Sequence, residues 1–224
     1  MHAGNKTYSS IKDIPDQVPV FPLSGALLLP GGQMPLNIFE PRYLEMIDAA
    51  LRGDRVIGMI QPKFSGETGS PDKPNLCSVG CLGRVASFAE SGDGRYLVSL
   101  QGICRFRVSD EVHVRTHFRQ CRIIPFASDL TEDQDDGAAV DREELLRVFR
   151  AYLEANELEA DWESVQRAGN DTLVNALSMM SPYGPAEKQA LLEAPDLKSR
   201  AETLIALTEM SLARDKDDSG RTLQ

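Results

Sequence analysis

The residues of this sequence best suited to bind a ligand are arginines that alternate with apolar residues. In an extended strand, the segment "ICRFRVS" (103–109) would present its arginines on one side and its apolar residues on the other. Two later arginines could extend the same surface. The four residues of this predicted face are Arg105, Arg107, Arg115 and Arg119. Such a face could bind an acidic peptide or the phosphates of a nucleic acid. A solvated sheet surface, or pairing with acids of the same chain, is the favoured alternative.

Residues that could perform covalent chemistry form no motif. The sequence has no phosphate-binding glycine loop, no dinucleotide fingerprint and no G-x-S-x-G elbow. His2 lies near the start of the chain, and neighbouring arginines would disfavour the protonated forms of His113 and His117. The acidic pairs Asp135-Asp136 and Glu143-Glu144 fall in a linker and at a helix start. We expect no catalytic residue and no cofactor, and an unrecognised hydrolase is the minor alternative.

The four cysteines do not have the close spacing of a zinc ribbon. Cys77 and Cys81 are four positions apart, and His113 and His117 follow more than thirty residues later. Cys104 and Cys121 complete the set. Small buried hydrophobes in a reducing compartment are favoured over metal ligands, so no metal is expected.

Composition and charge favour an ordinary globular protein. The chain has 224 residues, of which 42% are hydrophobic and 26% charged. Its first 17 residues lack the apolar core of a signal peptide, and no apolar run approaches the ~20 residues of a membrane span, so we predict a cytoplasmic protein. Residues 1–125 carry 14 basic and 12 acidic residues (+2), and residues 126–224 carry 10 and 22 (−12). The total of −10 opposes nucleic-acid binding.

Residues 18–126 predict a β-barrel or strongly curved sheet. Apolar residues alternate with polar ones in "GRYLVSLQG", "CRFRVS" and "EVHVRTHF", and apolar strands are expected at 18–23 and 55–62. Gly92 and Gly94 in "SGDG" suit a hairpin turn. One helix is expected to interrupt the strands, with Pro41 in its first turn and Gly53 as its C-terminal cap.

The remaining segments predict a helical bundle with polar flanks. Residues 142–213 show helical spacing, with starts indicated by Asp141, Asn170, Pro185 and Asp196 and a shorter helix around Trp162. Residues 127–141 are expected to be an acidic linker. Residues 1–17 are expected to be a disordered or extended tail, and residues 214–224 a polar tail.

Two long motifs resemble the Lon substrate-binding domain family. The first is "VPVFPLSGALLLPGGQMPLNIFEPRYLEMIDAAL", and the second is "VGCLGRVASFAESGDGRYLVSLQGICRFRV" at 79–108. The segment "KQALLEAPDLKSRAETLIALTEM" is also similar, so the resemblance covers roughly 18–212. It implies an α+β fold, a PUA-like β-barrel followed by a helical bundle. In full-length Lon proteases this region precedes an ATPase module and a Ser-Lys peptidase and helps to capture substrate polypeptides.

The resemblance implies binding without catalysis. It implicates no catalytic residue here and suggests a salt-bridge or backbone role for Glu40 and Arg42, with Phe39 and Tyr43 in the core. Part of the loop "LLLPGGQM" is expected to be exposed and to offer an apolar contact through Leu28, Leu29 and Met34. We therefore expect a non-enzymatic module for unfolded or partner polypeptides, an adaptor or holdase in protein quality control, working with a protease system. The alternative is an RNA- or nucleic-acid-binding PUA-like protein that uses the four arginines.

Overall fold

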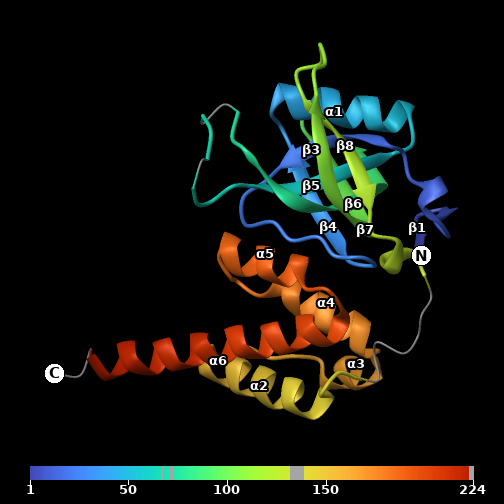
Figure 1. Ribbon diagram of the computed structural model, residues 1–224. Coiled ribbons are helices and arrows are strands. Elements are labelled where there is room, and N and C mark those ends of the chain that lie inside the picture. The colour runs from blue at the N-terminus through green and yellow to red at the C-terminus, as the bar shows by residue number, and fades with distance from the viewer. Residues whose placement is uncertain (67, 71–72, 132–138, 222–224) are drawn as a thin grey trace. The chain divides into compact units, whose positions relative to one another are not determined.

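The computed structural model describes residues 1–66, 68–70, 73–131 and 139–221, and the chain divides into two compact units (Figure 1). The first comprises Met1–Glu132 and Ser181–Leu192 and is called the sheet unit here. The second comprises Asp133–Met180 and Glu193–Gln224 and is called the helical unit. The fold is therefore α+β, as predicted. No helix in the described residues is long and apolar enough to cross a membrane.

The sheet unit is built on six paired strands in the order β4-β7-β6-β5-β3-β8, and β8 also pairs with β7. The pairing of β3 with β5 is parallel, and the other pairings are antiparallel. The bounds are β3 Gln17–Pro22, β4 Gln33–Ile38, β5 Val56–Pro62, β6 Leu76–Glu90, β7 Tyr96–Val112 and β8 Arg119–Pro125. The pairings of β3 with β5 and β8, and of β4 with β7, join strands that are not consecutive in the chain.

Strands β6 and β7 form one long hairpin, where the alternation predicted several short strands. The turn contains Gly92 and Gly94 at φ 80° and 85°, as the "SGDG" pattern predicted. The expectation of a strand over 111–118 is wrong beyond Val112, because residues 113–118 connect β7 to β8. Phe118 is the buried residue of this connection. The alternation of apolar and polar residues alone cannot distinguish a strand from a loop that is held by one buried side chain.

Helix α1 (Pro41–Arg52) begins at Pro41, as predicted. Tyr43 is buried on its inner face, and Arg42 forms an ion pair with Glu40 at 2.9 Å. Phe39 does not belong to the core as expected, because 62% of its surface is exposed. It follows the end of β4, where the chain turns outward into the helix.

The N-terminal residues are not a disordered or extended tail. Strands β1 (His2–Ala3) and β2 (Lys6–Thr7) form a small hairpin, followed by the 3-10 helix η1 (Ile11–Asp13). Tyr8 is fully buried, and Arg84 donates hydrogen bonds to its hydroxyl at 3.3 Å and to Asn5 Oδ1 at 3.1 Å. Burial of the Tyr8 ring therefore orders this segment, although its polar composition had suggested that it would be disordered.

Part of the expected acidic linker belongs to the sheet unit. Residues Ala127–Leu130 form the 3-10 helix η2, in which Leu130 is buried. Asp129 forms an ion pair with Arg105 at 2.7 Å, and the side chains of both are more than nine-tenths buried. The carboxylate therefore acts as a partner for a buried cation and not as a solvated charge. The part of the linker at 132–138 lies outside the described residues.

All of helix α5 (Pro185–Glu193) except its last residue clusters with the sheet unit, although the sequence predicted it to be part of the helical bundle. The buried amide of Gln61 donates to Pro185 O at 2.9 Å and to Gln189 Oε1 at 3.1 Å. Gln189 in turn donates to Val79 O at 3.1 Å. These bonds attach the helix to β5 and β6.

The helical unit contains α2 (Arg142–Ala155), α3 (Trp162–Arg167), α4 (Asn170–Met180) and α6 (Leu197–Arg221). Asp141 accepts the Glu144 N–H at 3.0 Å, and Asp196 accepts the Ser199 N–H at 2.7 Å, as expected of helix caps. Helix α6 continues beyond residue 213, so the expected polar tail is helical up to Arg221.

Candidate functional site

The leucines of the loop expected to bind polypeptide are buried. Leu28 is 2% and Leu29 0% exposed, so the expectation that these two residues are exposed is wrong. The loop lies against β7: Gly31 N–H donates to Gly102 O at 3.1 Å, and Gly102 N–H donates to Gly32 O at 2.8 Å. A Cβ at Gly102 would lie 2.0 Å from Leu29 O, so the approach requires glycine there. Met34, in β4, is half-buried.

Arg105 is not part of an exposed basic face. Only 3% of the residue is accessible, and its guanidinium donates to Asp129 and to the Leu192 carbonyl, the latter at 3.3 Å. The ring of Phe126 lies 5.1 Å from the guanidinium carbon. Burial of this charge is compensated by its partners, so Arg105 has a structural role.

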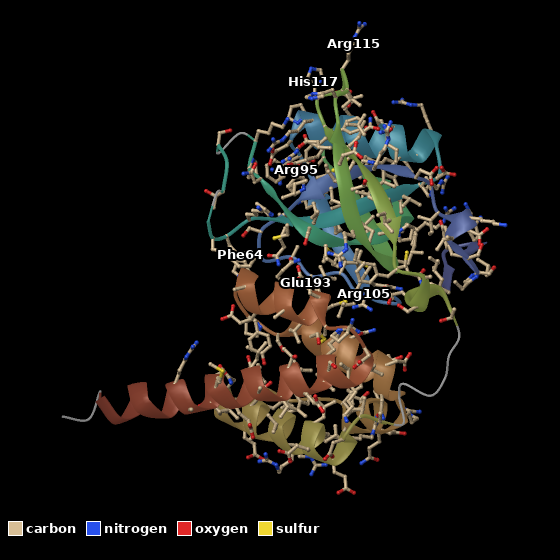
Figure 2. All side chains as sticks on the ribbon, in the orientation of Figure 1. Phe64, Arg95, Arg105, Arg115, His117 and Glu193 are labelled. Atoms are coloured by element: carbon tan, nitrogen blue, oxygen red, sulfur yellow. The ribbon has the colours of Figure 1, made fainter. Side chains whose placement is uncertain are left out.

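The other three arginines do not gather on one surface. Arg107 is exposed near Phe126, whereas Arg119 binds Glu111 through two hydrogen bonds of 3.0 and 2.7 Å. Arg115 lies at the tip of the β7–β8 connection, at the opposite end of the sheet unit from Arg105 (Figure 2). Nothing in this arrangement favours a nucleic-acid interface.

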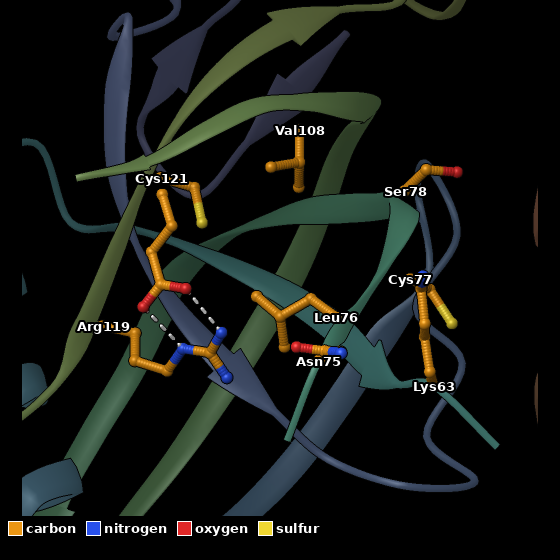
Figure 3. Close-up of a pocket in the computed structure, with 9 residues that line it drawn as sticks. Lys63, Asn75, Leu76, Cys77, Ser78, Val108, Arg119 and Cys121 are labelled. Atoms are coloured by element: carbon orange, nitrogen blue, oxygen red, sulfur yellow. Dashed lines mark hydrogen bonds and ion pairs between the residues drawn. The ribbon is translucent and has the colours of Figure 1, made fainter. Parts of the chain in front are cut away.

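A pocket of about 510 Å³ in the sheet unit is the best candidate for a binding site (Figure 3). It lies where the connection between β5 and β6 meets β7 and β8. Its apolar lining comes from Leu76, Cys77, Val108 and Cys121. Its polar lining comes from Lys63, Asn75, Ser78, Glu111 and Arg119. Figure 3 shows Leu76 between Arg119 on one side and Cys77 on the other.

Irregular strand pairing shapes this pocket. The β5–β6 register shifts between Ile60 and Pro62, and the β7–β8 register shifts between Val108 and Asp110. A register shift bends a strand and changes the direction of its side chains. Both shifts lie next to residues that line the pocket, Leu76 in β6 and Val108 in β7. Leu76 and Val108 remain partly exposed.

The polar rim is held in place by an ion-pair network. Glu111 accepts from Arg119 and lies 3.2 Å from Lys73 Nζ, and the hydrogen bonds from Arg119 lower the pKa of Glu111. Arg119 also donates to Pro74 O at 2.6 Å. Lys63 is exposed, and no ion pair joins it to another of the described residues. The Arg119 side of the rim is thus held by several polar contacts, whereas Lys63 on the other side has no ion pair with a described residue.

The two cysteines of the pocket contribute apolar surface. Burial raises the pKa of Cys121 to about 11, so its thiol is neutral at physiological pH and a poor nucleophile. The Cys77 thiol lies 3.7 Å from Pro62 O. All four cysteines are free and buried, as expected. Among the described residues, no three His, Cys, Asp or Glu side chains are grouped to hold a metal ion.

Sequence analysis did not identify this pocket. Its residues come from the 63–78 segment, the end of β7 and the start of β8, and register shifts leave no signal in a single sequence. Of its lining residues, only Cys77, Arg119 and Cys121 had been singled out, each for another reason. The apolar floor of the pocket can bind an apolar side chain of a peptide, and its polar groups can form hydrogen bonds with the peptide backbone. The volume of the pocket is in the range of known ligand pockets.

Comparison with known proteins adds a family match to this geometry. The family described as "ATP-dependent protease La (LON) substrate-binding domain" matches residues 17–209. The chain is 28% identical to Lon protease 2 of Myxococcus xanthus over 205 residues and 27% identical to Lon protease of Anaeromyxobacter dehalogenans over 202 residues. Each alignment covers 88% of this chain but only 24% and 23% of those relatives. The chain thus spans about a quarter of their length.

Two solved structures share the fold. The N-terminal domain of Mycobacterium avium complex Lon protease has a TM-score of 0.64 at 20% identity and covers 86% of this chain and 98% of that domain. The Lon N-terminal domain protein from Xanthomonas campestris has a TM-score of 0.61 at 22% identity, with coverage of 85% and 97%. At these identities the likeness is one of architecture.

Proposed function

Because the chain belongs to the Lon substrate-binding domain family, we propose that it is a polypeptide-binding module that uses the pocket between Lys63, Leu76 and Arg119. The observation that carries the proposal is the family match, which extends over residues 17–209. The pocket supports it with a partly exposed apolar floor and a rim that is already ordered. Ordered rims reduce the entropy lost when a flexible chain binds.

The module acts without catalysis, as an adaptor or holdase in cytoplasmic protein quality control. Its partners are unfolded polypeptides and a protease system. Support comes from the matched family, whose description is that of a substrate-binding domain, and from the high pKa of the thiol in the pocket. The pairing of β8 with both β3 and β7 is compatible with a PUA-like β-barrel, which we propose as the architecture of the sheet unit.

Filling the pocket tests the proposal. Ser78 is exposed and lines the pocket, so Ser78→Trp should occupy it at little cost in stability. We expect binding of a fluorescein-labelled, permanently unfolded protein to weaken by about tenfold or more, as for loss of a central contact. Fluorescence anisotropy measures the affinity. Ser87→Trp is the matched control, because Ser87 is also exposed on β6 but lies outside the pocket.

Two outcomes would contradict the proposal. The first is that no unfolded protein binds the unmodified chain. The second is that Ser78→Trp and Ser87→Trp bind it equally well while melting at the same temperature, which would move the contact to another surface.

To distinguish a holdase from an adaptor, the chain is added to a heat-denatured enzyme and to a degradation assay with an ATP-dependent Lon protease. A holdase suppresses light scattering, whereas an adaptor accelerates cleavage.

A further inference from the structure

A second pocket, of about 530 Å³, lies in the helical unit between the end of α2 and the start of α3. Its lining residues are Arg150, Leu153, Glu154, Leu158, Glu159, Ala160 and Trp162. The turn that forms one wall is fixed by its own backbone: Leu158 N–H donates to Leu153 O at 2.9 Å, and Glu157 takes φ 54°. Asn156 also donates its amide to Tyr152 O at 2.8 Å. The pocket is therefore ordered before any ligand arrives.

The pocket presents apolar surface to solvent. Leu158 is 54% exposed, which is high for a leucine beside an indole ring. Trp162 is partly buried, and its ring packs against Phe149 in an edge-to-face arrangement with centroids 6.2 Å apart. The guanidinium of Arg150 lies 4.5 Å from the Trp162 ring centre. The indole is thus immobilised, and part of it remains available for contact.

Two carboxylates line this pocket. Glu154 and Glu159 line it, and neither forms an ion pair with another residue in the described part of the chain. With Arg150, the lining carries one positive and two negative charges. The surrounding chain has the same sign, since residues 126–224 hold 10 basic and 22 acidic residues, a net −12. A cationic ligand would therefore be attracted to this unit at long range and could pair with Glu154 and Glu159 once bound.

We propose that this pocket is a docking site for a basic, apolar polypeptide segment of a partner protein. An aliphatic side chain of that segment packs against Leu158 and Trp162, and a neighbouring lysine or arginine pairs with Glu154 and Glu159. The acidic field repels nucleic acids and anionic lipid surfaces. Apolar side chains next to carboxylates suit a polypeptide segment that carries both aliphatic and basic side chains. The site is separate from the pocket of the sheet unit and does not depend on the function proposed for it.

The test measures binding of short fluorescein-labelled peptides by anisotropy at about 50 and 300 mM salt. The probe alternates lysine with leucine; one comparison peptide alternates lysine with serine, and the other alternates glutamate with leucine. We expect only the lysine–leucine peptide to bind well, and Glu154→Lys with Glu159→Lys to weaken it by about tenfold or more. Leu158→Ser should weaken it by about fivefold at both salt concentrations, because this contact is apolar.

The matched control reverses two charges elsewhere on the same unit. Glu143→Lys with Glu202→Lys changes the net charge by the same amount at exposed positions of α2 and α6 outside the pocket. We expect at most about a twofold loss from the weakened field. Equal losses in both double variants would overturn the proposal, because attraction would then be nonspecific. Equal binding of the lysine–serine peptide, or no binding of the lysine–leucine peptide, would also overturn it.

Failure here can be distinguished from failure of the proposed function. Ser78→Trp fills the pocket of the sheet unit and should leave binding of the lysine–leucine peptide unchanged. Conversely, the Glu154→Lys and Glu159→Lys variant should still bind a neutral unfolded protein at the pocket of the sheet unit. A loss of lysine–leucine binding in Ser78→Trp would place that peptide in the other pocket and refute the docking site.

Discussion

Two of the four arginines whose spacing suggested a ligand surface are instead bound by groups within the sheet unit. Arg105 is buried against Asp129, and Arg119 is held by Glu111 and the Pro74 carbonyl. A fork of N–H donors opposite a carboxylate gives two parallel hydrogen bonds, which fix the orientation of both groups. The pair of Arg119 and Glu111 fixes the position of the polar rim at the pocket of the sheet unit.

The Glu111–Arg119 pair should make stability depend on pH. Arg119 lowers the pKa of folded Glu111, so its stabilisation is present above the unfolded pKa of about 4.3 and is lost as pH falls through the folded pKa. We expect Glu111→Gln to cost about 1 kcal/mol of unfolding free energy at pH 7 and progressively less as pH falls through the folded pKa of Glu111. Urea denaturation from pH 3 to pH 8 measures the difference.

A suitable control for this titration is Asp110→Asn. The Asp110 carboxylate lies 3.6 Å from Arg122, and about half or more of each side chain is exposed. We therefore expect this substitution to change the unfolding free energy by only a few tenths of a kcal/mol. A deficit of Glu111→Gln that stayed constant across the whole pH range would contradict an electrostatic origin.

Among the elements, α5 is held by an amide network that its sequence does not reveal. Gln61 is almost fully buried and accepts the Gly25 N–H at 2.9 Å while donating to the helix. Gln189 is buried as well and returns a hydrogen bond to β6. Because such groups have no water to replace a lost partner, each is costly to remove. The helix therefore depends on two glutamines as well as on apolar packing.

Single and double substitutions should show that these two glutamines act together. We expect Gln61→Leu and Gln189→Leu each to lower the unfolding free energy by about 2 kcal/mol, because each leaves buried partners unsatisfied. The loss of unfolding free energy in the double variant should be at least about 1 kcal/mol smaller than the sum of the two single losses. In the double variant both partners of the hydrogen bond between Gln61 and Gln189 are absent, so neither is left unsatisfied by the loss of the other. Urea denaturation provides the three values, and strict additivity would refute the coupling. Gln120→Ala, at an exposed pair with Gln17, is the control.

At the scale of the whole molecule, the chain passes between its two units more than once. It leaves the sheet unit at Glu132, returns for Ser181–Leu192 and leaves again. The acidic segment is thus one of three crossings. A cut there does not separate two complete domains, because the Arg105 guanidinium and the Gln61 amide would lose partners contributed by α5.

A fragment of residues 1–131 should therefore be less stable than the sheet unit of the full chain. We expect its melting temperature to fall by at least about 5 °C, and a synthetic peptide of residues 181–194 to restore it in proportion to peptide concentration. Near-ultraviolet circular dichroism follows the transition, and a scrambled peptide is the control. An unchanged melting temperature with no effect of the peptide would show that α5 is dispensable for this unit.

The sequence alone determined the boundaries of several local elements and indicated the family. Pro41 predicted the start of α1, Asp141 and Asp196 predicted helix caps, and Gly92 with Gly94 predicted the β6–β7 turn. These features depend on backbone preferences of residues close together in the chain. The resemblance to Lon substrate-binding domains is confirmed by the match over residues 17–209.

Only the tertiary structure decided which of these surfaces are exposed. Alternation predicts that residues share a face, but what covers that face comes from distant segments: β7 covers Leu28 and Leu29, and η2 covers Arg105. The same holds for both pockets, which depend on strand register shifts and on a fixed turn after α2. Burial and binding geometry are set by contacts between segments far apart in sequence, and a single sequence contains no direct record of those contacts.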